Sequence, residues 1–288
     1  MLKVMGRVLV VLAALVLAAS FAGDLHGVGD SLAVFRLAIL VGALFVSALV
    51  WRWRWAKVLA LVAFAIGGMQ MADGAFASVP DTPDFVLYQK NLLFRERDRT
   101  EFINDVLASG ADAVTLQEVG PANEAVLETL REWYPYQLLC NDVRLRRMAI
   151  VSRTPFEVEE CFEQSGAARV VTQVGGRSVQ VYSLHLYWPY PYPQARQVAA
   201  LAPIFEAQET DFTVVGGDFN MVASGRSVAA IEAATGTERV GRAAATYYLY
   251  GYPLAIDHVL ATGGAGALET RDKMGSDHLG LVASIVFP

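Results

Sequence analysis

Four short stretches of the chain place acidic, amide and imidazole side chains at or just after apolar runs. They are LQEV with Glu118, GGDFN with Asp218 and Asn220, IDHVL with Asp257 and His258, and GSDH with Asp277 and His278. Apolar runs of this length are typical of buried strands, and polar groups at strand ends cost free energy unless something uses them. A divalent metal ion and a phosphate ester together would use all of these groups.

The motif VVGGDFN predicts a buried strand that ends in a carboxylate and an amide. Asp218 and Asn220 alternate with Phe219, so both polar groups point to one side while Phe219 enters the core. Such a pair can position a water molecule and hold a phosphoryl oxygen. An Asx turn at a strand end is the alternative, and this motif alone does not exclude it.

Two further stretches carry an acid and a histidine. Asp257 lies inside the apolar run AIDHVLAT, where a buried carboxylate needs a partner, and a histidine is the natural one. His258 points to the opposite face by strand alternation, and we interpret it as structural. Asp277 and His278 precede the last apolar run; carboxylates suit Mg²⁺, and a histidine can carry a proton near neutral pH.

Two more polar residues, Asn91 and His185, join Glu118 at or near the ends of apolar runs. Asn91 ends FVLYQKN, Glu118 ends AVTLQEV, and His185 lies in QVYSLHLYWP with Ser183 on the same face. Each signal is weak alone, but the ordered set is specific. In this order the motifs resemble the endonuclease/exonuclease/phosphatase superfamily over residues 84–287. That superfamily includes DNase I-like nucleases, exonuclease III-like repair enzymes, sphingomyelinases and inositol-polyphosphate phosphatases.

The resemblance implies an α+β fold, a four-layer αββα sandwich with the site at one end of its two sheets. It implies a metal-dependent hydrolase acting on phosphoric ester bonds, with Mg²⁺ as cofactor and Mn²⁺ as a possible substitute. The metal site would consist of Asn91, Glu118 and Asp277, with Glu118 as the principal ligand.

The same resemblance implies roles for five catalytic residues. His185 would contact the scissile phosphate, Asp218 would orient or deprotonate the attacking water, Asn220 would hold a phosphate oxygen, Asp257 would orient the last histidine, and His278 would contact the phosphate or transfer a proton. The chain departs from many members in having SDHLGL, without a proline after the histidine.

Arginines and aromatic residues near these motifs are candidates for substrate contact. Arg95 and Arg147 are the predicted substrate-binding residues, out of two clusters that also contain Arg97, Arg99, Arg144 and Arg146. A guanidinium could hold a phosphate, although a solvated loop balancing nearby acids is an open alternative. The run YWPYPYP at 187–193 could form an aromatic wall for a substrate, a lip towards a membrane, or merely a rigid loop.

The first 78 residues differ from the rest in composition. Apolar stretches near 8–22, 31–51 and 58–77 predict a membrane anchor of three transmembrane helices, although the first could be a cleaved signal peptide. Basic residues near the start and in WRWRWAK belong inside, which places everything after about Ser78 on the extracytoplasmic, periplasmic side of an inner or plasma membrane. A linker at 79–84 then leads to a catalytic domain at 85–288.

The charge balance of the chain helps to choose between nucleic acid and other phosphate esters as substrates. Residues 1–78 hold six basic and three acidic residues, and subtraction from the totals of 23 and 29 leaves 17 basic and 26 acidic residues in the remainder. A protein that grips duplex DNA usually shows a basic face. We therefore expect a membrane-anchored phosphoesterase whose partners are the bilayer and a lipid headgroup, small phosphoester or nucleic acid, with no protein partner. A nuclease on extracytoplasmic DNA or RNA and a non-catalytic binding domain that retains the fold are the alternatives.

The sequence also predicts the helices and strands of the catalytic domain. Helical patterns begin at Thr100, Pro121 and Pro193. The predicted strands are 85–93, 113–119, 136–140, 148–152, 178–186, 212–216, 256–261 and 281–287. Cys140 and Cys161 flank one of them, so they could form a disulfide in an oxidising compartment or remain two buried thiols.

Overall fold

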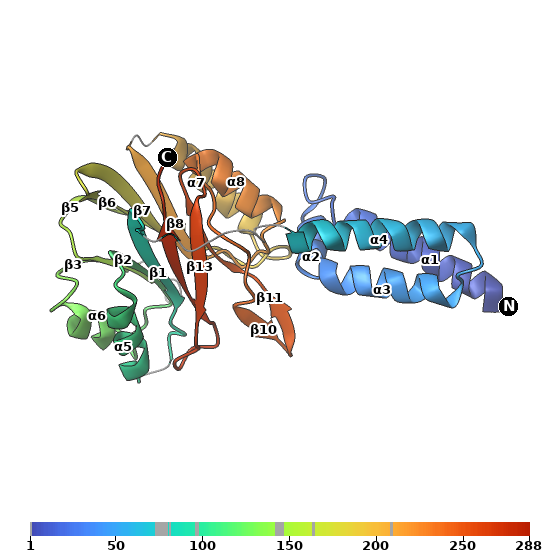
Figure 1. The fold of residues 1–288 in the computed structure, drawn as a ribbon, viewed down its shortest axis with the longest axis horizontal. Helices are drawn as coiled ribbons and strands as arrows, with labels where there is room; N and C mark the ends of the chain where they lie inside the picture. The colour runs from blue at the N-terminus through green and yellow to red at the C-terminus, as the bar shows by residue number, and fades with distance from the viewer. Residues whose placement is uncertain are drawn as a thin grey trace.

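The computed structural model describes residues 2–72, 80, 82–95, 98–141, 147–162, 165–207 and 210–288. A bundle of helices at the N-terminal end leads to a sandwich of two sheets, and the two parts lie end to end along the longest axis of the molecule (Figure 1).

The first sheet has six strands in the order β13-β14-β1-β2-β4-β3. These are β1 (Phe85–Asn91), β2 (Ala113–Gln117), β3 (Tyr136–Cys140), β4 (Met148–Ser152), β13 (Gly266–Arg271) and β14 (Gly280–Ile285). Only β1 and β2 pair in parallel within it; the other neighbours are antiparallel.

The second sheet also has six strands, in the order β5-β6-β7-β8-β12-β9. These are β5 (Phe156–Phe162), β6 (Ala167–Val174), β7 (Arg177–His185), β8 (Phe212–Asp218), β9 (Glu238–Arg239) and β12 (Asp257–Ala261). The parallel pair here is β7 with β8. A separate two-stranded hairpin consists of β10 (Tyr247–Leu249) and β11 (Tyr252–Leu254).

Helices cover the outer face of each sheet. The helices α5 (Thr100–Ser109) and α6 (Ala125–Leu130) pack on the first sheet, and α7 (Gln194–Glu206) and α8 (Arg226–Thr235) pack on the second. A third apolar cluster lies between the sheets. The predicted four-layer αββα sandwich is therefore confirmed. The predicted start of α5 at Thr100 is also confirmed, and the helix ends at Gly110 in the left-handed conformation with φ of 70°.

The disulfide forms between the two sheets. Cys140 at the end of β3 and Cys161 in β5 are bonded, with their Cα atoms 5.4 Å apart. The strands β3 and β5 are edge strands of different sheets. The bond therefore joins the two sheets at one open edge of the sandwich, and it settles the choice that the sequence left open between a disulfide and two thiols.

The N-terminal part consists of four helices: α1 (Leu2–Ala19), α2 (Gly27–Val34), α3 (Arg36–Leu49) and α4 (Arg54–Ala72). The segment at 31–51, predicted as one span, is instead a pair of helices bent by 76° at Phe35. Among the described residues, α4 alone has the length and hydropathy to cross a membrane, and the bent pair would be a second span if it counts as one. Three spans remain a prediction, and residues 73–77 of the third lie outside the described residues.

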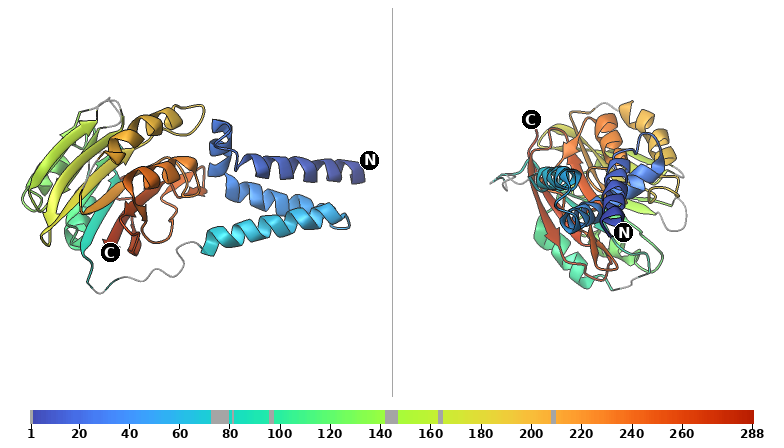
Figure 2. Two further views of the ribbon diagram at one scale, coloured as in Figure 1. Left: turned by 90° about the horizontal axis from the view of Figure 1, so that it is seen from above. Right: turned by 90° about the vertical axis from the view of Figure 1, so that its right-hand side faces the viewer.

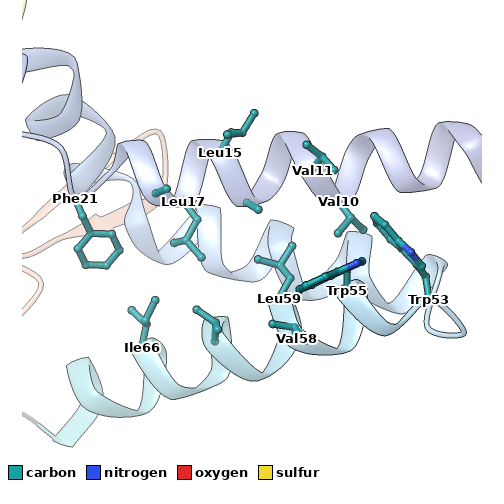
Figure 3. Close-up of a pocket in the computed structure, with 13 residues that line it drawn as sticks. Val10, Val11, Leu15, Leu17, Phe21, Trp53, Trp55, Val58, Leu59 and Ile66 are labelled. Carbon is teal, nitrogen blue, oxygen red and sulfur yellow. The ribbon is translucent and has the colours of Figure 1, made fainter.

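A groove of about 660 Å³ runs between α1 and α4. All thirteen side chains that line it are apolar or tryptophan. Trp53 lies at one end of the groove and Phe21 at the other, nearest the sandwich (Figure 3).

Candidate functional site

The predicted site residues lie at one end of the sandwich, because the strands that carry them meet there. In the parallel pair β7 and β8, His185 lies beside Asp218, and Asp218 lies opposite Asp257 in the antiparallel pair β8 and β12. In the other sheet Asn91 lies beside Gln117, the residue before Glu118. Strand ends from both sheets therefore supply one site.

Close approach of the two sheets brings these strand ends together. Gly216 occupies the inward position on β8 two residues before Asp218. A Cβ atom there would lie 2.8 Å from Leu87 Cδ2 and would also collide with the Thr115 hydroxyl, both on the opposite sheet. Glycine at this position lets the sheets approach without a side chain between them.

A hydrogen-bonded network of buried amides crosses from sheet to sheet beneath the site. Gln89 Nε2 donates to Gln117 Oε1 at 2.8 Å and to Asp257 Oδ1 at 3.1 Å. Gln117 Nε2 donates to Ser183 Oγ at 3.0 Å. Because buried polar groups need partners, this network fixes the position of Asp257 from below.

The centre of the site is the buried carboxylate of Asp218. Asn91 Nδ2 donates to Asp218 Oδ2 at 3.1 Å and to Glu118 Oε1 at 3.3 Å, so one amide holds both acids. The Nε2 atoms of His185 and His278 lie 3.7 and 3.8 Å from Asp218 Oδ2. Two acids, one amide and two imidazoles from both sheets thus surround a common point.

Asp257 and His278 form a buried pair. His278 Nδ1 lies 2.8 Å from Asp257 Oδ2. Burial opposes protonation of the ring, but the negative charges of Asp257 and Asp218 outweigh it and raise the pKa of His278 to about 9. Burial also opposes the charge on Asp257, but the positive charge and hydrogen bond of His278 lower the pKa of Asp257. The pair therefore presents a protonated Nε2 edge towards Asp218.

Glu118 and Asp218 are acids whose charge is poorly stabilised by the protein alone. Burial raises the pKa of Glu118, although the Phe94 amide donates to its Oε2 at 3.2 Å. Burial likewise raises the pKa of Asp218 to about 7, despite the nearby charge of His278. Glu118 also has a φ of 55°, a left-handed conformation that non-glycine residues rarely adopt. Strained backbone at a residue in this position is typical of functional sites.

Asn220 lies in the loop directly after Asp218. It also has a left-handed φ, of 48°. Its backbone N–H donates to Asp218 Oδ1 at 2.9 Å, which is the Asx-turn geometry, and its Nδ2 donates to Leu186 O at 2.8 Å. The side chain therefore joins the loop after β8 to the loop after His185.

The residues present fit a divalent cation. Ligand atoms of Asp218, Asp257 and His278 lie within 4.8 Å of one another, but the negative charge of Asp257 is already compensated by His278, which lowers the pKa of Asp257. The oxygens with unmet charge are those of Glu118 and Asp218, and hard carboxylate oxygens are the ligands that Mg²⁺ prefers. A divalent cation would therefore be held by Glu118 rather than by Asp257.

Two of the predicted metal ligands, Asn91 and Asp277, lie near the site but outside the group of three clustered ligand residues. Asn91 accepts from the Leu93 amide with its Oδ1, so its NH₂ group faces the two acids and orients them. Asp277 is half-buried, and its charge raises the pKa values of Glu118 and His278, which places it beside the site.

The substrate-binding role of Arg95 and Arg147 stays a prediction, and the structure shows only their surroundings. Arg147 forms an ion pair with Glu124 at 2.9 Å and donates to Asn141 at 3.0 Å, and Arg95 is exposed. Arg97, Arg144 and Arg146 lie outside the described residues. Arg99 is buried and donates to backbone carbonyls, including Met274 O, so it supports the loops around the site.

Sequence reasoning missed several supporting residues. Gln89 and Gln117 were detectable, because strand alternation places each on the inward face, and Gln89 is two residues before Asn91. Ser276 Oγ donates to Asn91 O at 2.7 Å and accepts from the His278 amide at 3.1 Å. The Tyr247 ring lies 4.8 Å from the His278 ring. No local pattern signals the contacts of Ser276 with Asn91 and of Tyr247 with His278, because each joins segments far apart in the chain.

His258 lies on the other face of β12, as strand alternation predicts. Its Nε2 lies 2.8 Å from Met221 O, and its ring contacts Phe219 edge-on at 5.3 Å. Burial lowers the pKa of His258 to about 4, so the ring is neutral near pH 7.

Comparison with known proteins agrees with this geometry. A family model described as the Endonuclease/Exonuclease/phosphatase family matches residues 88–278, well over half of the chain. The chain belongs to this family, whose members are metal-dependent phosphoester hydrolases, and it is an enzyme of that class. No curated protein matches the chain.

Several solved structures share the fold. An endonuclease/exonuclease/phosphatase family protein from Leptotrichia buccalis is 17% identical in sequence to this chain, with a TM-score of 0.56. The match covers 70% of this chain and 100% of the other protein's chain. Sphingomyelinase C from Streptomyces griseocarneus is 18% identical, with a TM-score of 0.51, covering 70% and 99%. A beta toxin variant from Staphylococcus aureus with bound magnesium ions is 14% identical, with a TM-score of 0.54, covering 70% and 99%.

Proposed function

We propose that this chain is a membrane-anchored phosphoesterase that uses Mg²⁺ to hydrolyse a phosphodiester or phosphomonoester through in-line attack by water. The observation that carries the proposal is the convergence of Glu118, Asp218, His185 and His278 at one point between the sheets. Two acids and two imidazoles match the demands of phosphoryl transfer, which needs charge neutralisation, a placed water and a proton for the leaving oxygen.

Each residue then has a task set by its surroundings. Glu118 would hold a divalent cation, which would supply charge neutralisation for the phosphoryl oxygens. Asp218 orients the attacking water and accepts its proton, a role that its raised pKa favours. His185 donates to a phosphoryl oxygen. His278, kept protonated by Asp257, donates from Nε2 to the phosphate or to the leaving oxygen.

The proposed location is the periplasmic side of the inner or plasma membrane. Basic residues cluster near the start of the chain and in the 51–57 segment, which includes the turn before α4 and the first residues of α4, and this favours a cytoplasmic position for both. The sandwich follows α4 and would then lie outside. The disulfide of Cys140 and Cys161 supports this, because such bonds persist in oxidising compartments.

The test uses the purified full-length chain in detergent or nanodiscs. Candidate substrates are bis(p-nitrophenyl) phosphate, plasmid and single-stranded DNA, RNA, and phospholipids of several headgroups, each with EDTA and after Mg²⁺ is restored. We expect Mg²⁺-dependent hydrolysis of at least one ester. Glu118→Gln and His278→Ala should abolish it, while Glu128→Gln, a change at an exposed glutamate on α6, should not.

Activity that persists in EDTA, or in both site variants, would overturn the assignment. Preferential cleavage of DNA or RNA over every other ester would identify the enzyme as a nuclease instead.

A further inference from the structure

The end of the sandwich that carries the site is also the end that contacts the helical bundle. The loop after His185 contacts α2, because Ser31 Oγ donates to Tyr190 O at 2.6 Å. The β10–β11 hairpin contacts the start of α3, because the Ala38 amide donates to the Tyr252 hydroxyl at 3.2 Å. Both loops border the site, since one follows His185 and the other carries Tyr247.

A third site loop is held by a buried arginine. Arg36 at the start of α3 is 5% exposed, and its Nη1 donates to Ser224 Oγ at 2.7 Å. Ser224 lies four residues beyond Asn220. Beside it, Arg226 Nη1 donates to Gly23 O at 3.2 Å. A buried guanidinium is costly unless paired, so this junction is a specific contact between helices and domain.

Apolar contacts reinforce the junction. Val34 at the end of α2 belongs to the same apolar cluster as the core beneath α7 and α8. The ring centroids of Phe35 and Tyr252 lie 5.8 Å apart, and those of His26 and Tyr190 lie 5.3 Å apart. Because packed apolar and polar contacts coincide, the domain is docked on the bundle in one orientation.

The dimensions of the bundle set the height of the site above the bilayer. The 19 residues of α4 span roughly 28 Å at 1.5 Å per residue, close to the hydrocarbon thickness of a bilayer, about 30 Å. Trp53 and Trp55 mark the inner end of the groove, and Phe21 marks the outer end beside the sandwich (Figure 3). Figure 2 shows the sandwich and the helical bundle end to end. In the proposed orientation, the docked end of the sandwich would therefore lie at the outer membrane surface.

Exposed tyrosines project from the two loops that border the site. We call Tyr190, Tyr192, Tyr248 and Tyr250 the tyrosine rim. They are 51%, 58%, 45% and 102% exposed. The β10–β11 hairpin that carries two of them lies on the bundle side of the sandwich (Figure 1). Tyrosine is enriched at membrane interfaces, where its ring and hydroxyl meet apolar and wet surroundings.

We propose that the site hydrolyses the phosphoester headgroup of a lipid held in the outer leaflet, with the tyrosine rim seated at the bilayer surface beside it. This deepens the proposed function and rests on it. The water oxygen bonds to phosphorus, the bond from phosphorus to the leaving oxygen breaks, one water proton passes to Asp218, and His278 supplies the proton of the leaving oxygen. The site is fixed at the height of a headgroup, so the substrate needs no extraction from the bilayer.

The first test measures the position of the rim. Both native cysteines are in the disulfide, so Tyr250→Cys and, as a matched control, Trp133→Cys on the α6 side can each carry one environment-sensitive fluorophore in the full-length chain. In phosphatidylethanolamine and phosphatidylglycerol vesicles, spin-labelled lipids should quench the label at position 250 and leave the label at 133 unaffected. Equal or absent quenching would overturn the proposal.

The second test compares a lipid with its own headgroup. Phosphatidylglycerol, phosphatidylethanolamine, sphingomyelin and a phosphatidylinositol phosphate in vesicles are each compared with the deacylated or chain-free ester, and bis(p-nitrophenyl) phosphate serves as a soluble reference. Shared confinement to one surface raises effective concentration, so at least one bilayer ester should be cleaved on the order of tenfold faster than its chain-free counterpart. Tyr250→Ser should reduce that ratio, and Trp133→Ser should not.

The outcomes separate the two proposals. EDTA-sensitive hydrolysis of the soluble diester without preference for any bilayer ester would overturn the lipid proposal and leave the phosphoesterase standing. Failure to hydrolyse every ester, the soluble diester included, would overturn both.

Discussion

The two halves of the space between the sheets have opposite characters. In one half Phe85, Phe212 and Phe287 pack together, with the rings of Phe212 and Phe287 stacked at 4.2 Å. In the other half the same strands present amides, acids and imidazoles. On β1 the inward face runs from Phe85 and Leu87 to Gln89 and Asn91, so the change occurs within a single strand.

The apolar half therefore provides stability, and the polar half provides the groups for chemistry. The apolar half holds the sheets together by burial of large side chains. The polar half contains acids whose charge the fold does not stabilise, together with left-handed backbone at Glu118 and Asn220. Such a site is expected to cost stability that the rest of the domain supplies.

The largest expected effect is the loss of activity in the polar half. Asp218→Asn removes the carboxylate that faces both imidazoles and keeps the shape of the side chain. We expect kcat/KM to fall at least about a thousandfold, as for loss of a positioned base. Because Asp218 is buried and its charge is disfavoured there, the unfolding free energy should stay the same or rise.

Steady-state kinetics and urea unfolding of the same preparation measure both quantities. A variant that lost activity and several kcal/mol of stability together would show that Asp218 is a structural residue, and the contrast between the halves would fail.

The reverse pattern is expected in the apolar half. Phe85 is 1% exposed and lies 6.3 Å from the Phe287 ring. Phe85→Ala should lower the unfolding free energy by roughly 3–4 kcal/mol, through lost burial and the cavity left behind. The fraction that remains folded at low temperature should keep its kcat. A large fall in kcat at full occupancy of the folded state would show that packing in this half also positions the site.

Much of this contrast could be predicted from the sequence. The ends of apolar runs located the strand ends, and the strands at 136–140 and 148–152 have the predicted bounds. The polar group at each strand end was visible because few apolar runs end in a carboxylate or imidazole without a use for it. The structure places His185, Asp218 and His278 around one point, as the ordered motifs imply.

Other features depend on contacts that local pattern does not encode. The strand β5 escaped prediction because it is an edge strand with glutamates at alternate exposed positions. The helix α8 escaped it because its N-cap, Gly225, provides no capping side chain. The bend between α2 and α3 coincides with a long-range contact, since the Phe35 ring packs against Tyr252. The hydrogen bond between Gln89 and Gln117 likewise depends on the pairing of strands that are far apart in the chain.

A smaller effect, on the pH dependence of stability, is expected at His258. This residue lies on β12 next to Asp257, on the outer face of the sheet. Its pKa is near 4 when folded and 6.5 when free. As the pH falls from 6.5 towards 4, the unfolded chain binds a proton that the folded chain does not, so stability is lost over this window. A difference of about 2.5 pKa units corresponds to about 3 kcal/mol.

The matched variant is His258→Gln, whose amide can still donate to Met221 O. Urea unfolding of both proteins between pH 7 and pH 4 should show that the wild type loses more stability than the variant. Parallel pH profiles would contradict the prediction, because they would mean that the pKa of His258 is the same in the folded and unfolded chain.

The smallest expected effects lie at the boundary between the halves, on β7. Ser183 accepts from Gln117 and donates to Leu116 O, and Val181, one inward position earlier, belongs to the apolar cluster. Ser183→Ala should cost about 1 kcal/mol of stability, the worth of a buried hydrogen bond, and should change kcat/KM only severalfold. Val181→Thr, nearly the same size, should cost roughly 1–3 kcal/mol because its hydroxyl enters apolar surroundings. If Val181→Thr proved neutral while Ser183→Ala abolished activity, polar character would extend deeper along β7 than the contacts show, and the boundary would have to move towards the phenylalanine end.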